Sequence, residues 1–119
     1  MKMDEYQDLA SRTMSDYAND NFATAVYSMG LAGEAGEVVD YLKKVVGHGH
    51  PLDKDILSKE LGDVLWYVAA LCAHNGLSMS EVAQGNVDKL KVRYPDGFSS
   101  ERSISRTDEV GAQSIAPVC

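Results

Sequence analysis

Apolar residues recur at helical spacing along most of the chain and predict four helices. The expected spans are about residues 4–18, 23–46, 53–75 and 78–94. No segment shows the strict alternation of apolar and polar residues that is typical of a half-buried strand. The pattern therefore predicts an all-α fold.

Local signals mark the ends of these helices. Residues 19–21, Asn-Asp-Asn, form a cluster of helix-breaking residues, and the glycines and proline of segment 47–51 separate the second helix from the third. Gly76 suits the position just after a helix. Residues 78–81, Ser-Met-Ser-Glu, have the form of a capping box that opens the fourth helix.

The length of 119 residues suits one domain. After the turn at residues 95–97, Pro-Asp-Gly, the sequence becomes polar and rich in serine. We therefore expect a single domain over residues 1–106 and a flexible, polar C-terminal tail over residues 107–119.

Three glycines, Gly30, Gly33 and Gly36, lie inside the second expected helix. Each glycine costs a helix interior about 1 kcal/mol relative to alanine. Three of them favour close approach by another backbone or by a ligand. The alternative is a locally weak or kinked start to this helix.

Two pairs of acidic residues carry the main chemical signal. Glu34 and Glu37 lie on the second helix, and Glu60 and Asp63 lie on the third. The i, i+3 spacing places each pair about 60° apart around the helix axis, so both carboxylates project from one face. Each pair can hold one cation. The alternative is that these are solvated surface acids.

The surroundings of the four acids favour a metal site. They lie in apolar runs, and like charges at i, i+3 destabilise a helix slightly. Lys59, four residues before Asp63, is the only basic residue one turn from any of them. Because half-buried charges without partners are costly, a divalent cation is the economical source of positive charge. Carboxylate oxygens favour Mg²⁺, with Mn²⁺ as the alternative, and Mg²⁺ commonly completes its shell with substrate phosphates.

Basic residues are expected on matching faces. Lys44 lies seven residues after Glu37, on the acidic face of its helix, while Lys43 points away. Asn86, Lys89 and Arg93 share one stripe of the fourth helix. These four residues would suit a polyphosphate; the alternative is an ordinary solvated helix face.

Composition excludes several classes of function. The net charge of −7 argues against wrapping a nucleic-acid polymer, which calls for a basic surface. No apolar stretch approaches the roughly 20 residues that span a bilayer, and the first residues lack the apolar core of a signal peptide. The two cysteines form no metal-binding or disulfide pattern. We therefore expect a cytoplasmic protein that has no membrane partner.

The spacing Glu-x-x-Glu, 22 residues, Glu-x-x-Asp resembles the signature of the MazG-like all-α nucleoside triphosphate pyrophosphohydrolases. The surrounding sequence is similar as well: residues 30–37 read GLAGEAGE, residues 60–67 read ELGDVLWY, residues 86–90 read NVDKL and residues 93–98 read RYPDGF. The likeness covers about residues 6–106. It departs from the family at Gly33, where the fuller motif often doubles the first glutamate.

The resemblance implies that the four acids bind Mg²⁺ and that water attacks between the α- and β-phosphates of a nucleoside triphosphate. The products would be a nucleoside monophosphate and pyrophosphate. Two alternatives stay open. One is a narrower substrate in the same superfamily, a deoxynucleotide or phosphoribosyl-ATP. The other is an assembly module that binds Mg²⁺-nucleotide without cleaving it.

The resemblance also implies a homodimer or homotetramer, and burial supports this. The second and third helices carry wide apolar stripes, which need neighbours on more than one side. The expected fold is thus a four-helix MazG-like bundle completed by oligomerisation.

Overall fold

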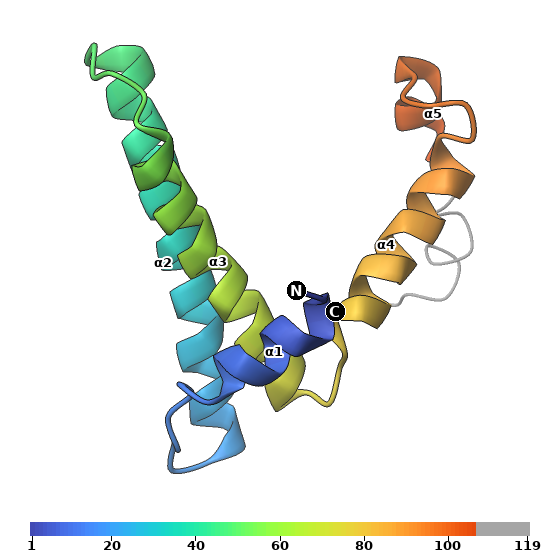
Figure 1. Ribbon diagram of the computed structural model, residues 1–119. Coiled ribbons are helices and arrows are strands. Elements are labelled where there is room, and N and C mark those ends of the chain that lie inside the picture. The colour runs from blue at the N-terminus through green and yellow to red at the C-terminus, as the bar shows by residue number, and fades with distance from the viewer. Residues whose placement is uncertain (107–119) are drawn as a thin grey trace. The chain divides into compact units, whose positions relative to one another are not determined.

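The computed structural model describes residues 1–106, and within that range it contains only helices (Figure 1). The helices are α1 (Met3–Ser11), α2 (Asp20–Gly47), α3 (Lys54–His74), α4 (Met79–Arg93) and α5 (Ser100–Ser105). The predicted all-α class is confirmed. The predicted tail, 107–119, lies outside the described residues. The chain forms two compact units, Met1–Met79 and Ser80–Cys119, and each is described by itself.

In the first unit, α2 and α3 run antiparallel and lie side by side, and α1 packs on α3 (Figure 1). Side-chain caps fix where the long helices begin. Asn19 accepts a hydrogen bond from the backbone N–H of Phe22 at 2.8 Å, and Asp53 accepts one from that of Asp55 at 2.9 Å. The expected breaker at 19–21 is therefore a cap, and α2 begins at Asp20, three residues earlier than predicted.

One buried cluster joins α2 to α3. Ala23 and Tyr27 of α2 pack against Ala70 of α3. One turn along α3, the ring of Tyr67 covers Gly30, where a Cβ would overlap the ring. The two helices therefore approach each other closely at Gly30. This contact lies one turn from Glu34 on α2 and one turn from Asp63 on α3.

A second cluster joins α3 to α1 and to the start of α4. Ala69, Cys72 and Met79 are buried in it. The side chain of Gln7 on α1 accepts from the Met79 N–H at 2.7 Å and donates to the Leu77 carbonyl at 2.8 Å. Gln7 thus holds the loop that follows α3 against α1.

The prediction that the first helix reaches residue 18 was wrong. The helix ends at Ser11, and the Thr13 hydroxyl, which donates to the Ala10 carbonyl at 2.8 Å, accepts from Trp66 Nε1 at 2.7 Å. Threonine hydroxyls that bond to nearby backbone compete with helix formation. Tyr17, expected on the helix, instead packs on the α2–α3 cluster from the connecting segment.

The described part of the second unit contains α4, a turn and α5. Gly97 adopts φ +90° in the turn, and the Tyr94 and Phe98 rings lie 5.3 Å apart across it. Ser99 caps α5 by accepting from the Arg102 N–H at 3.1 Å. The sequence analysis missed α5 because six serine-rich residues carry no apolar periodicity.

Candidate metal centre

Three of the four predicted acids meet between α2 and α3. Oxygen atoms of Glu34, Glu60 and Asp63 all lie within 4.8 Å of one another. Glu34 and Glu60 are half-buried and Asp63 is exposed. The antiparallel pairing of the two helices produces this meeting, because it places the acidic turn of α2 beside the acidic turn of α3.

The fourth acid, Glu37, lies outside this group. It is exposed, one turn further along α2 and about 60° around the axis from Glu34. Its charge still acts on the cluster, since it helps to raise the pKa of Glu34. The expected pair on α2 is therefore split: Glu34 joins Glu60 and Asp63, and Glu37 is exposed outside that group.

Electrostatics at the cluster favour a cation. Partial burial raises the pKa of Glu34, and the nearby charges of Asp63, Glu60 and Glu37 raise it further. Within residues 1–106 no lysine or arginine forms an ion pair with any of these acids, and Lys59 does not reach Asp63. A bound cation would offset the negative charge that these acids share.

The donor set fits a hard divalent ion. Three carboxylates offer oxygen atoms from one side, which is compatible with the few protein ligands and several remaining positions that Mg²⁺ prefers. No histidine or cysteine belongs to the cluster, so the softer donors that favour zinc or iron are absent from it.

The glycines near the site play different roles. Gly30 admits Tyr67, whereas a Cβ at Gly33 or Gly36 would meet nothing within 4 Å. Gly62, which precedes Asp63, is equally open. The neighbour at Gly30 is therefore a side chain and not the backbone or ligand that was expected, and among the described residues nothing lies close to Gly33 or Gly36.

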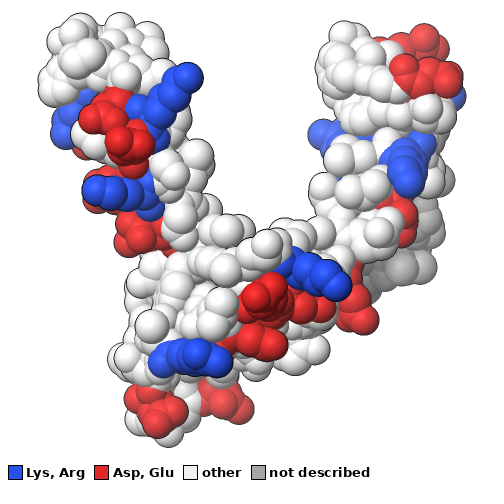
Figure 2. Space-filling model, in the orientation of Figure 1, with Lys and Arg blue, Asp and Glu red and all other residues white. Residues whose placement is uncertain are grey.

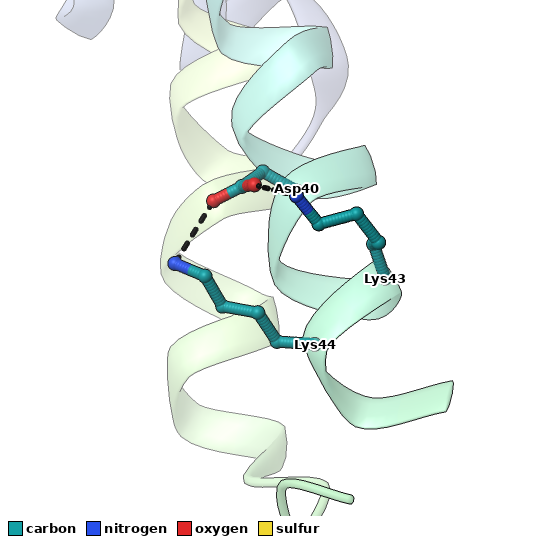
Figure 3. Close-up of polar contacts among 3 residues, drawn as sticks. All are labelled: Asp40, Lys43 and Lys44. Atoms are coloured by element: carbon teal, nitrogen blue, oxygen red, sulfur yellow. Dashed lines mark ion pairs between the residues drawn. The ribbon is translucent and has the colours of Figure 1, made fainter. Parts of the chain in front are cut away.

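Lys44 lies on the acidic side of α2 and is already engaged. Its Nζ is 3.0 Å from one oxygen of Asp40, and Lys43 Nζ is 2.9 Å from the other oxygen (Figure 3). Lys43, which was expected to point away from the acidic face, reaches the same carboxylate as Lys44. The sequence analysis missed Asp40, although its i+3 and i+4 spacing to the two lysines was a signal for it.

The other predicted substrate-binding residues lie on α4, in the second unit. Asn86 and Lys89 are exposed, whereas Arg93 is only 9% exposed. The Arg93 guanidinium carbon lies 5.9 Å from the centre of the Tyr94 ring. The stripe is therefore not uniformly solvated, and its relation to the acids stays a prediction.

Two further observations concern the surface and the helices of the described residues. On the face drawn in Figure 2, acidic and basic side chains of the described residues are interspersed, and the basic ones form no continuous stripe. Among residues 1–106, no helix combines the length and the apolar character needed to cross a membrane.

Comparison with known proteins shows the family of this chain. The family described as MazG nucleotide pyrophosphohydrolase domain matches residues 23–98, a span that includes every predicted site residue. "Gene 37 protein" of Mycobacterium phage L5 is 40% identical over 74 residues, which cover 59% of this chain and 65% of that protein, slightly less than two thirds of its length. No solved structure matches. The chain belongs to the MazG nucleotide pyrophosphohydrolase domain family.

Proposed function

We propose that the protein hydrolyses nucleoside or deoxynucleoside triphosphates, in a Mg²⁺-dependent reaction, to the nucleoside monophosphate and pyrophosphate. The observation that carries this proposal is the cluster of Glu34, Glu60 and Asp63 oxygens within 4.8 Å, which has no ion-pair partner among the described residues. Family membership supplies the type of reaction. Mn²⁺ is an alternative ion for the same oxygen ligands.

The four acids would have two different roles. Glu34, Glu60 and Asp63 would hold the metal, which when bound neutralises phosphate charge and lowers the pKa of a coordinated water. Glu37 is exposed and lies outside the group of three, so its carboxylate is available to accept a proton from the attacking water.

Four further residues would bind the substrate. Lys44, Lys89 and Arg93 would offset the charge of the phosphates, and Asn86 would donate or accept hydrogen bonds. Lys44 shares a helix with Glu34 and Glu37, which supports its place at the phosphates. The assignments on α4 rest on the sequence pattern of the stripe.

A panel of substrates tests this proposal and its alternatives. Pyrophosphate release from the eight common ribo- and deoxynucleoside triphosphates and from phosphoribosyl-ATP would be measured with Mg²⁺. Broad cleavage supports the proposal, and cleavage of one deoxynucleotide or of phosphoribosyl-ATP alone supports the narrower alternative. Nucleotide binding without cleavage would indicate a non-catalytic module. The same assay with Asp63→Asn tests the site, and we expect this variant to lose pyrophosphate release. Asp55→Asn is its control, since both residues are exposed acids on α3.

We also propose a homodimer or homotetramer. Large apolar side chains of α2 and α3 remain exposed, among them Met29 at 66%, Val39 at 67% and Leu61 at 50%. Exposed large apolar side chains favour an interface, and a symmetric pairing would cover them. Sedimentation equilibrium at micromolar concentration tests this, because a single species near 12.9 kDa would contradict it.

A further inference from the structure

We infer that Asp40 is a positioning residue for phosphate binding: it holds the Lys44 ammonium on the acidic side of α2, where Lys44 meets the substrate. This inference rests on the proposed function. It adds to that function a residue that touches neither metal nor substrate and acts through Lys44.

The geometry of the cluster carries the inference. Each oxygen of Asp40 binds one lysine, Lys43 at 2.9 Å and Lys44 at 3.0 Å (Figure 3). Lys44 follows Glu37 by seven residues, two helical turns, and lies about 20° from it around the axis. Helical side chains lean toward the N-terminus, so Lys44 leans toward Glu37. Asp40 lies between Glu37 and Lys44 along the helix, and its carboxylate binds the Lys44 ammonium.

The charges of the cluster suit a phosphate ligand. The two lysines hold the pKa of Asp40 at about 2, mainly through their hydrogen bonds to its carboxylate, so Asp40 stays ionised at neutral pH. Two ammonium groups and one carboxylate leave a net charge of +1. Lys43 therefore offsets Asp40, and the cation on Lys44 remains available to an anion.

Exposure explains why Lys44 needs a positioning partner. Its side chain is 43% exposed, and a lysine with a flexible four-carbon stem loses much rotamer freedom when it binds a ligand. A partner that already restricts the stem reduces this loss. A helix-stabilising pair without a role in binding is the competing explanation, and so is a carboxylate that competes with phosphate for Lys44.

Steady-state kinetics of the full chain with Mg²⁺ and its best triphosphate separate these explanations. We expect Lys44→Met to raise KM about tenfold and Asp40→Asn about threefold, with kcat within about twofold of the unaltered protein. Asp40→Glu should restore most of the affinity. In a Lys44→Met background, Asp40→Asn should add no further change, because the partner it positions is gone.

Two controls separate the effect of losing the Asp40–Lys44 pair from the effect of a change in net charge. Lys43→Met makes the same change in net charge as Lys44→Met but keeps the Asp40–Lys44 pair, so it should raise KM less. Asp8→Asn removes one exposed helical acid on α1 and should leave KM unchanged. Circular dichroism and thermal unfolding of each variant identify effects that come from helix stability alone.

The outcomes are distinguishable. If Asp40→Asn leaves KM unchanged, the inference is overturned in favour of a structural pair. The same holds if Asp40→Asn raises KM threefold both in the unaltered protein and in the Lys44→Met background. A lower KM in Asp40→Asn overturns it in favour of competition. If the unaltered protein releases no pyrophosphate from any triphosphate, the proposed function itself fails and this inference fails with it.

Discussion

The ring of Tyr67 on α3 lies directly over Gly30 on α2, so that a Cβ at position 30 would overlap it. Overpacking of this kind typically costs 1–3 kcal/mol, and Tyr67 packs on the buried cluster that contains Tyr27. We expect Gly30→Ala to lower the free energy of unfolding by about 1–3 kcal/mol. Urea unfolding followed by circular dichroism measures this.

Gly33 on the same helix provides the matched control. A Cβ there meets nothing within 4 Å, so alanine adds helix propensity without a clash. Gly33→Ala should raise the free energy of unfolding by up to about 1 kcal/mol. Equal effects of the two substitutions would contradict the close contact between Gly30 and Tyr67.

Magnesium is expected to stabilise the folded protein through Glu34, Glu60 and Asp63. When free Mg²⁺ exceeds its Kd tenfold, the gain is about 1.4 kcal/mol, visible as a rise in Tm. Asp63→Asn should reduce this rise strongly, whereas Asp55→Asn on the same helix should leave it intact. A rise of equal size in both variants would place the ion elsewhere.

Glu37 is expected to separate metal binding from catalysis. As an exposed acid outside the group of three, it should act on the attacking water. Glu37→Gln should therefore lower kcat by at least about 100-fold and keep most of the Mg²⁺-induced rise in Tm. Loss of that rise would show that Glu37 is a metal ligand instead.

The pKa of Glu34 predicts how stability changes with pH. Because this pKa is raised above its usual 4.5 in the folded state, the folded protein binds more protons than the unfolded chain just above that pH. Without metal, the contribution of Glu34 is therefore most favourable below pH 4.5 and becomes less favourable as the pH rises through its folded pKa. The pKa of Asp40 is lowered from 3.8 to about 2. Asp40 therefore stabilises the folded protein above pH 3.8, and this contribution is lost as the pH falls toward 2.

The comparison of Glu34→Gln with the unaltered protein isolates this effect. In excess chelator, the variant should gain stability relative to the unaltered protein as the pH increases from 4 to 7. Thermal unfolding across this range checks the trend. A difference that stays constant with pH would mean that neither burial nor the charges of Asp63, Glu60 and Glu37 raise the pKa of Glu34.

The long helices were predictable because their apolar stripes and caps are local. Asp53 and Gly76 bracket α3 as expected. The end of α1 was not predictable, because Thr13 leaves the helix to bond with Trp66, more than fifty residues away in sequence. A contact of that kind has no local signature.

The site was predictable in kind and less so in detail. The i, i+3 spacing on α3 was enough to predict that Glu60 and Asp63 lie together. The structure shows that the pairing of α2 with α3 adds Glu34 to them. Glu37 was expected to share the ligand role equally, yet only Glu34 of the pair on α2 joins Glu60 and Asp63. The ion pair between Lys44 and Asp40 was not predicted, because the helical spacing also allowed Lys44 to face Glu37.

The most direct test of the central claim is ³¹P NMR of a deoxynucleoside triphosphate incubated with the protein and Mg²⁺, and with Glu60→Gln as comparison. The account predicts resonances of monophosphate and pyrophosphate in equal amounts, absent in excess chelator and absent with Glu60→Gln. Diphosphate with orthophosphate as products, or undiminished turnover by Glu60→Gln, would contradict it.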